Sequence, residues 1–364
     1  MLVRVHVVRP ANTARLHGYR GQYRMCTAEK GQKWRPGFVS LEYAGVYPRN
    51  AHLAEKLMTD GSVQACIEPD LPLVSSWRRL LQQAFKAGVV PQTQASPLGT
   101  LRNLKASQKV FSVAAQTRSE ASIRRKIHHA VNENGGARAL LFVSGSSVLR
   151  KSPFMEYLSM DSVAMIGLAA RMRAAGEIPA HVEFWAVANP NVPSTKRNLE
   201  LELVKIEEKI EAGATHVVTQ PFLHLSHATQ FWKAARKRGL LERCDWHIGM
   251  GIFPTPAAYT FWLYLSGIQA DAETRAHTQH IQQCLEQDGN TTAQVARLQW
   301  IRSLQFLTDT LEVHQTERVC GLHVMPLRAH AFVPDLIHLA RETQTKVSRS
   351  DAQREDSDHC VGFR

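Results

Sequence analysis

The chain has 364 residues, of which 44% are hydrophobic and 21% charged, values typical of a globular protein with a buried core. It contains no run of about 18 uncharged apolar residues, so the sequence predicts no transmembrane helix and no membrane partner. The 44 Lys and Arg residues outnumber the 32 Asp and Glu residues and give a net charge of +12. These basic residues are scattered along predicted helices without a nucleic-acid-binding motif, so we expect anionic small molecules rather than nucleic acid as partners.

The two ends of the chain differ in composition from the middle. Residues 1–34 form a basic N-terminal extension, and residues 1–28 contain five arginines but no acidic residue. Such a composition resembles a mitochondrial transit segment, although an ordinary basic extension explains it equally well, so mitochondrial and cytoplasmic locations both stay open. The polar, aperiodic residues 347–364 predict a disordered tail.

Between these ends, short apolar strand patterns alternate with amphipathic helix patterns. The strand candidates are Phe38–Tyr43, Val89–Thr93, Val110–Gln116, Ala139–Ser144, Val182–Val187, His216–Gln220, His247–Ile252 and Val319–Val324. Helical patterns cover 119–134, 161–175, 199–212, 226–239 and 331–342. Eight such strands over about 300 residues predict an α/β fold, a single (β/α)8 TIM barrel spanning residues 35–346.

Two connections of the predicted barrel are unusually long. Residues 272–313 hold two extra helical patterns before the last strand, an insertion that could cover one end of the barrel. Residues 44–88 are expected to connect the first strand to the second. No G-x-G-x-x-G motif follows any strand, so a Rossmann cofactor site is not indicated.

Cysteine and histidine spacing gives no sign of a metal site. The six cysteines lie far apart, without a C-x-x-C pair, and the 17 histidines show no H-E-x-x-H arrangement. We therefore expect free thiols in a reducing compartment and no bound metal.

Residues 199–223 give the clearest local pattern in the chain. An amphipathic helix is expected to stop at Gly213, because glycine tolerates the left-handed conformation that often ends a helix. A short strand, His216–Thr219, then delivers Gln220 at its carboxyl end, where parallel α/β folds place ligand contacts. The alternative, equally weighted here, is that Gln220 only caps the end of the strand.

Glu42 stands inside the otherwise apolar first strand. Burying an unpaired carboxylate costs several kcal/mol, so this group should be paired, protonated or used in chemistry. A catalytic acid and a glutamate paired with Lys or Arg at the barrel mouth are the two alternatives.

Three segments resemble the flavin-dependent methylenetetrahydrofolate reductases: AVANPNVPSTKRN and the chain that follows it to Gln220 (186–220), HIGMGIFPTP (247–256) and VSLEY (39–43). The resemblance implies a catalytic barrel that uses FAD to pass a hydride from NADH or NADPH to 5,10-methylenetetrahydrofolate. The product would be 5-methyltetrahydrofolate, which serves one-carbon metabolism and methionine biosynthesis. No ribose-reading motif separates NADH from NADPH, and the homo-oligomer that the family allows is not specified by any residue.

The resemblance also assigns roles to single residues. Glu42 becomes the catalytic acid, and Gln220 the residue that pairs with the pterin edge of the folate substrate. Arg328, in the CGLHVMPLR segment (320–328), would contact the substrate, unless it is an ordinary surface arginine. Lys209 would contact the flavin phosphates, unless it is a solvated helix lysine.

The remaining cofactor-binding positions that the resemblance implies are Ser112, Ser144, Gly145, Ser146, Asn189 and Glu202. Several of them depart from the family pattern: Ser144 and Ser146 replace the arginine and aspartate of an Arg-Gly-Asp segment, and Ser112 and Asn189 replace a histidine and a tyrosine. Glu202 keeps the charge of the usual aspartate. Losing an arginine removes a bidentate contact, so the substitutions predict weaker FAD binding.

Two rival functions follow from these observations. One is a degenerate barrel of the same family that binds folate or another heterocycle without flavin catalysis. The other is a non-enzymatic nucleic-acid or assembly protein attracted by the basic net charge, whose binding would depend steeply on salt.

Overall fold

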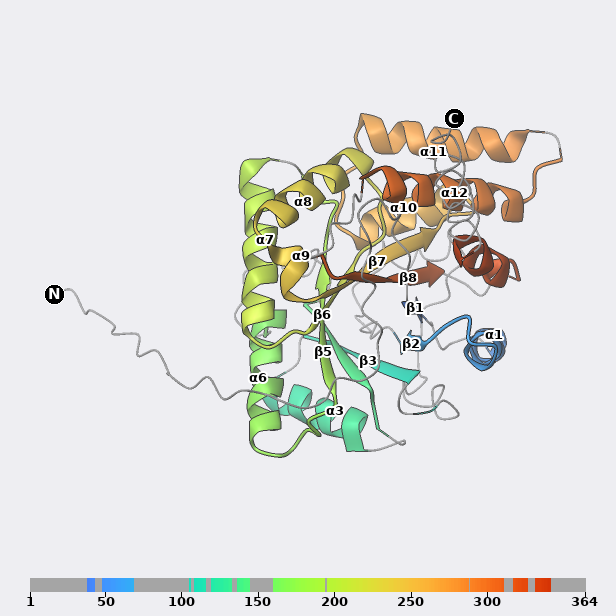
Figure 1. Ribbon diagram of the computed structural model, residues 1–364. Coiled ribbons are helices and arrows are strands. Elements are labelled where there is room, and N and C mark those ends of the chain that lie inside the picture. The colour runs from blue at the N-terminus through green and yellow to red at the C-terminus, as the bar shows by residue number, and fades with distance from the viewer. Residues whose placement is uncertain are drawn as a thin grey trace, which may run out of the picture.

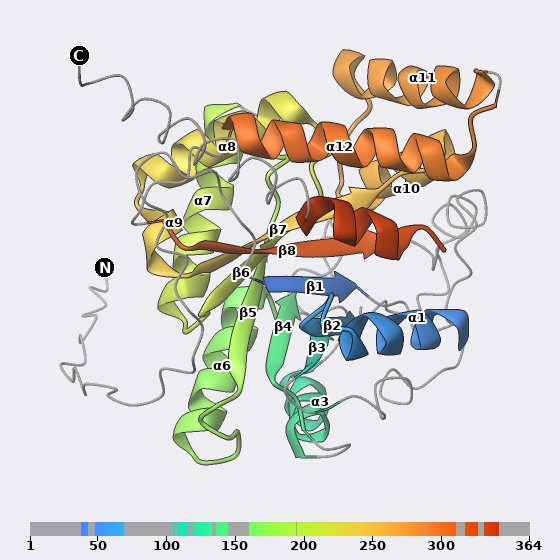
Figure 2. The same cartoon turned by 45° about the vertical axis from the view of Figure 1, so that its right-hand side comes forward.

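The computed structural model describes residues 38–42, 48–68, 105, 108–115, 119–132, 136–144, 160–193, 195–287, 289–310, 317–326 and 331–341. Eight strands form a closed barrel in sequence order, with the last strand paired to the first (Figures 1 and 2). Every neighbouring pair is parallel. The predicted (β/α)8 barrel is therefore confirmed.

The eight strands agree with the sequence-based assignment except for the second. They are β1 (Phe38–Glu42), β2 (Ala65–Glu68), β3 (Lys109–Ala114), β4 (Ala139–Val143), β5 (Glu183–Ala188), β6 (His216–Thr219), β7 (Asp245–Ile252) and β8 (Val319–Pro326). The assignment of the second strand to 89–93 was wrong, because β2 lies within the stretch expected to be a connection. Residues 89–93 themselves lie outside the described part of the chain.

Helices follow most strands and cover the outside of the barrel. They are α1 (Pro48–Thr59), α3 (Glu120–Asn132), α6 (Ser162–Ala174), α7 (Lys196–Glu211), α8 (Leu225–Lys237), α9 (Leu240–Arg243), α10 (Pro256–Leu265), α11 (Ala272–Glu286) and α12 (Thr292–Thr310), with a further helix at 333–341. The predicted insertion before the last strand is confirmed as α11 and α12, which pack against each other beside the barrel (Figure 2). Among the described residues, no helix is long and apolar enough to cross a membrane.

Local sequence signals explain where several helices start and stop. α7 ends at Glu211, and Gly213 follows with a φ of 119°, the conformation that the predicted glycine stop requires. α6 starts after Asp161, whose side chain accepts a hydrogen bond from the Ala164 N–H. The ends of these helices thus fix where the following strands begin, including β6, which Gln220 follows directly.

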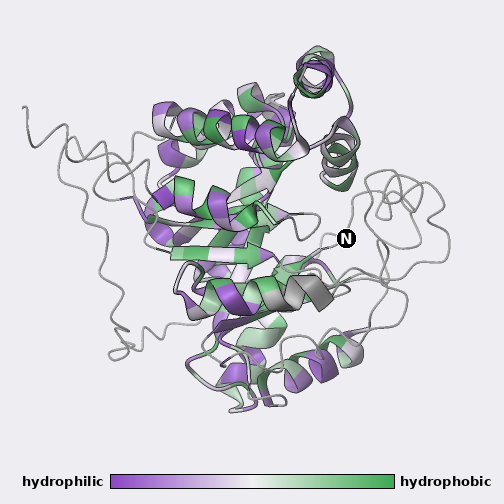
Figure 3. Ribbon diagram, turned by 90° about the vertical axis from the view of Figure 1, so that its right-hand side faces the viewer, coloured by the Kyte–Doolittle hydropathy of each residue, from purple (hydrophilic) through white to green (hydrophobic). Residues whose placement is uncertain are grey.

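The core has an inner and an outer layer. Inside the barrel pack residues such as Phe38, Ile67 and Trp185, which alternate along their strands with outward-facing residues. The outer layer lies between strands and helices, and the helices accordingly carry both hydrophobic and hydrophilic residues (Figure 3). The aromatic residues of α8 and α10 contribute to the core, since Trp232, Tyr259, Phe261 and Trp262 are all buried.

The basic extension (1–34) and the tail (347–364) lie outside the described residues, so both remain predictions. The same holds for the transit function of the extension.

Candidate site at the mouth of the barrel

Glu42 lies at the carboxyl end of β1 on the inner face of the barrel. Phe38 is part of the inner core cluster, and side chains alternate along a strand, so Ser40 and Glu42 share its face. The Glu42 side chain is 26% exposed, which leaves it within reach of a ligand in the mouth. The inner face of the first strand therefore ends in a carboxyl group.

Glu42 is connected to two further polar residues inside the barrel. Strand pairing sets Ser40 opposite His323 of β8, and the Ser40 Oγ lies 3.0 Å from the His323 Nδ1. The His323 Nε2 lies 3.6 Å from the Glu42 Oε2, within ion-pair range but too long for a direct hydrogen bond. We call Ser40, His323 and Glu42 the Glu42 relay.

The Glu42 relay can hold a proton at either end of the imidazole. With the hydrogen on Nδ1, His323 donates to Ser40 and presents an acceptor to Glu42; with the hydrogen on Nε2, it presents a donor to Glu42. Ser40 and His323 are both buried, so solvent does not compete for these contacts. The sequence predicts no role for Ser40 or His323, although Ser40 lies in the VSLEY segment and His323 in the CGLHVMPLR segment.

Gln220 follows β6 and carries an unmet hydrogen-bonding group. Its backbone N–H donates to the Ala188 carbonyl oxygen at 2.8 Å, which continues the ladder between β5 and β6. Its side-chain oxygen Oε1 is buried and accepts no hydrogen bond from the described residues. A buried acceptor without a partner costs about 1–3 kcal/mol, a cost that a ligand donor would remove. Within the described residues this atom does not cap the strand end, and its contact with a ligand remains a prediction.

Most of the polar groups predicted to hold the flavin form hydrogen bonds with other residues of the protein. Ser144 Oγ donates to the Ser162 Oγ at 2.7 Å and accepts from the Ser162 N–H at 3.1 Å, which ties β4 to the start of α6. Ser112 differs, because it is buried on the inner side of β3 and its hydroxyl makes no hydrogen bond with a described residue.

Asn189 and Glu202 are bound to each other. The Asn189 N–H donates to the Glu202 Oε1 at 2.9 Å, and its side-chain Nδ2 donates to the Ser266 carbonyl oxygen at 3.2 Å. The Asn189 Oδ1 accepts from the backbone and side chain of Asn191. These bonds connect the loop after β5 to α7 and to the end of α10.

Lys209 is buried rather than solvated. Only 7% of the residue is exposed, and its Nζ donates to the Val187 carbonyl oxygen of β5 at 2.7 Å. Four of the five described flavin-side residues therefore have polar groups bonded within the protein, and their contact with a flavin remains a prediction. Gly145, Ser146 and Arg328 lie outside the described residues, so their roles remain predictions.

The described residues contain no group of three or more His, Cys, Asp or Glu side chains placed to bind a metal ion. The four cysteines in this part of the chain, Cys66, Cys244, Cys284 and Cys320, are free thiols. Burial raises the pKa of the Cys66 thiol to about 12, so this thiol stays protonated at neutral pH.

A closed parallel barrel with polar inner-face side chains at the carboxyl ends of its strands is the architecture of TIM-barrel enzymes. The family model of methylenetetrahydrofolate reductase matches residues 96–337, more than half of the chain. The chain belongs to the methylenetetrahydrofolate reductase family. The match includes Gln220 and His323 but begins after β1, so Glu42 lies outside it.

Solved structures to which the chain is similar have low sequence identity to it. An uncharacterized protein from Clostridium thermocellum that binds two copies of 5-methyl-5,6,7,8-tetrahydrofolic acid is 13% identical, with a TM-score of 0.51 over 85% of this chain and 96% of that chain. A long-chain alkane monooxygenase is 11% identical, with a TM-score of 0.48 over 87% of this chain and 92% of that chain. No curated protein sequence matches the chain significantly.

Proposed function

We propose that the mouth of the barrel binds a reduced folate, with the pterin edge on Gln220 and the bound one-carbon region facing Glu42. The Oε1 of Gln220 is the main support for this proposal, because it is buried and accepts no hydrogen bond from a described residue, so a ligand donor could pair with it. Family membership supports it, as does the tetrahydrofolate bound by the structural relative from Clostridium thermocellum.

The chemistry of a primary amide suits a pterin. Gln220 offers an acceptor and two donors in one plane, and the edge of a pterin presents N–H donors beside ring and carbonyl acceptors. A carboxylate at the same place could only accept. The amide therefore recognises the heterocycle without adding a charge to the mouth.

The Glu42 relay adds a second capability to this site. A carboxyl group at the mouth can hold a proton at the atom that faces the folate, and His323, 3.6 Å behind it, can stabilise its charged form. Binding alone does not need a carboxyl group at this place. Its presence therefore favours chemistry on the bound folate.

This relay supports a second candidate, the NAD(P)H-dependent reduction of 5,10-methylenetetrahydrofolate to 5-methyltetrahydrofolate with FAD. FAD would supply the hydride in that reaction. The internal bonds of Ser144, Asn189 and Lys209 argue against it, because they occupy groups that would face the cofactor. We therefore place folate binding first and the reductase reaction second.

Calorimetric titration of the full chain with 5-methyltetrahydrofolate tests the first proposal. We expect Gln220→Leu to weaken binding about tenfold or more, because a lost bond to a buried polar group is worth about 1–3 kcal/mol. Gln230→Leu is the matched control, since Gln230 is exposed on α8, away from β6. No binding by the unmodified protein, or equal binding by Gln220→Leu, would refute the proposal.

Flavin absorbance and NAD(P)H oxidation separate the two candidates. If the reductase reaction occurs, added FAD binds, NAD(P)H bleaches it, and Glu42→Gln slows reoxidation by methylenetetrahydrofolate about a hundredfold or more without changing the bleaching. If the protein binds folate but takes up no FAD, the reductase reaction is excluded and folate binding is the candidate that remains.

A further inference from the structure

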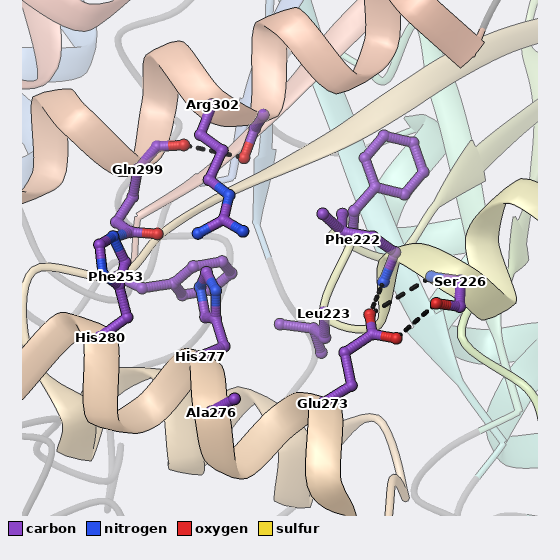
Figure 4. Close-up of a pocket in the computed structure, with 12 residues that line it drawn as sticks. Phe222, Leu223, Ser226, Phe253, Glu273, Ala276, His277, His280, Gln299 and Arg302 are labelled. Atoms are coloured by element: carbon purple, nitrogen blue, oxygen red, sulfur yellow. Dashed lines mark hydrogen bonds between the residues drawn. The ribbon is translucent and has the colours of Figure 1, made fainter.

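A second cavity lies beside the barrel, separate from the mouth site. It has a volume of about 520 Å³ and is bounded by the loop after β6, by α11 and by α12 (Figure 4). Neither Gln220 nor any member of the Glu42 relay lines it. We call it the hairpin pocket, after the two inserted helices that form its walls.

The floor of the hairpin pocket is apolar and held in place by packing. Phe222 and Phe253 are only 6% and 4% exposed. The Phe222 ring packs edge-on against Phe306 at 5.4 Å, and the Phe253 ring packs in the same way against Tyr259 at 5.4 Å. This rigid aromatic floor suits a ligand with a flat apolar body.

Gln299 of α12 lines the pocket with a side-chain amide and is only 4% exposed. A primary amide can both donate and accept hydrogen bonds. It can therefore bond to a polar atom of a ligand in the cavity.

Arg302, an exposed residue of α12, brings a positive charge to the same cavity. In Figure 4 its guanidinium enters from α12 on the side opposite His277 and His280 of α11. It forms no ion pair or hydrogen bond with a described residue. The one carboxylate on the pocket wall, Glu273, is already used: it accepts from the Leu225 N–H at 2.7 Å and from the Ser226 Oγ at 2.5 Å, and it lies 3.3 Å from the His224 ring.

The histidine beside Arg302 is neutral at physiological pH. Burial lowers the pKa of His277 to about 4, and the charges of Arg302 and His280 act in the same direction. Among the described residues that line the pocket, Arg302 is the one lysine or arginine, and its planar group suits a carboxylate or sulfonate.

We propose that the hairpin pocket is a second ligand site that binds a small aromatic acid. The acid group pairs with Arg302, the ring packs on Phe222 and Phe253, and the Gln299 amide bonds to a polar atom of the ligand. The site is independent of the reduced folate proposed for the mouth.

Calorimetric titration with 2-naphthoate, an aromatic carboxylate that the pocket is large enough to hold, tests the proposal on the full chain. We expect Arg302→Gln to weaken 2-naphthoate binding about twofold to fivefold, because Arg302 is exposed and its ion pair with the carboxylate is screened by solvent. Arg297→Gln is the matched control, because Arg297 is exposed on the same helix and does not line the pocket. The uncharged 2-naphthamide should lose little affinity in either variant, and Gln299→Leu should weaken binding of both compounds.

Three results would overturn the proposal. They are no 2-naphthoate binding at about millimolar concentration, equal binding by the Arg302→Gln variant, and equal loss in the Arg297→Gln control. A competition experiment distinguishes binding in the hairpin pocket from binding in the mouth. Saturating 5-methyltetrahydrofolate should leave 2-naphthoate binding unchanged. Displacement would place 2-naphthoate in the mouth and refute a second site, and it would leave the folate proposal standing.

Discussion

At Gly249, the inner face of β7 comes closer to β6 than a side chain would allow. A Cβ atom there would lie 2.1 Å from the Thr219 carbonyl oxygen, 2.5 Å from the Met325 Cε and 2.7 Å from the Gln220 carbonyl carbon. The Gly249 N–H also donates to the Thr219 Oγ1 at 2.8 Å. The glycine thus allows the close contact that holds the backbone of Gln220.

Gly249→Ala should therefore destabilise the fold and disturb the mouth site. Two of the close atoms belong to backbone, so relief requires movement of β6, and we expect a loss of about 2–4 kcal/mol in the free energy of unfolding by urea titration. Gly167→Ala is the contrasting variant: Gly167 lies within α6, where a Cβ would meet only an Arg171 nitrogen at 3.7 Å. That variant should gain about 0.5–1 kcal/mol from helix propensity. Equal stability of the two variants would contradict the close-packing argument.

The start of α11 joins the inserted helices to the barrel. Asp271 forms a capping box with Thr274, and its Oδ2 lies 2.7 Å from the His224 Nε2 in the loop after β6. Burial alone would raise the pKa of Asp271, but the hydrogen bonds from Thr274 and His224 outweigh it and hold the pKa well below its usual range. Asp271 is therefore ionised at neutral pH and serves as both helix cap and anchor.

Asp271→Ala should lower the free energy of unfolding by about 1–2 kcal/mol, because it removes the cap and leaves His224 without its closest partner. Asp271→Asn should cost less, since asparagine caps helices well and only the charge is lost. Urea titrations of the three proteins measure the difference. The interpretation fails if the asparagine variant loses as much as the alanine variant.

The elements that the sequence predicted well are those with enough residues to show a period. The 16 residues of α7 and the glycine after it are visible in the sequence, and so is the strand that ends at Gln220. β2 has only four residues, Ala65–Glu68, which is too short for an alternation to stand out from the surrounding chain. Because β2 is so short, the sequence predicts the second strand at the more apolar segment 89–93 instead.

The candidate site was only partly predictable for a related reason. Gln220 and Glu42 stand out locally, as polar residues at the ends of apolar strands. The contact between Ser40 and His323 depends on β8 closing the barrel against β1, across 283 positions of sequence. The internal bonds of Asn189 and Lys209 likewise depend on which loops meet, and a linear pattern does not contain that information.

Across the whole molecule, buried histidines couple folding to pH. Burial lowers the pKa of His216, of His247 and of His277, and the value for His277 falls to about 4. The first two lie inside the barrel, stacked with their rings 5.4 Å apart, and the third lies on α11. All three must lose their proton when the chain folds below the usual histidine pKa of about 6.5.

Acidification should consequently destabilise the protein. The unfolded chain binds more protons than the folded one below pH of about 6.5, so the free energy of unfolding falls as pH drops, and for His277 the fall continues to about pH 4. We expect a loss of about 1 kcal/mol from His277 between pH 7.5 and 5.5, with further losses in the same direction from His216 and His247. Urea titrations at the two pH values measure it, and His277→Gln should reduce the difference. Equal stability at both pH values would show that these histidines are not buried in their neutral form.

The most direct measurement is a crystal structure of the full chain with 5-methyltetrahydrofolate. We predict the pterin in the mouth of the barrel, with its edge within hydrogen-bonding distance of the Gln220 amide and with Glu42 facing the reacting side of the folate. A folate found only in the hairpin pocket, or a mouth in which Gln220 Oε1 stays without a partner while ligand is bound elsewhere, would contradict the proposed function.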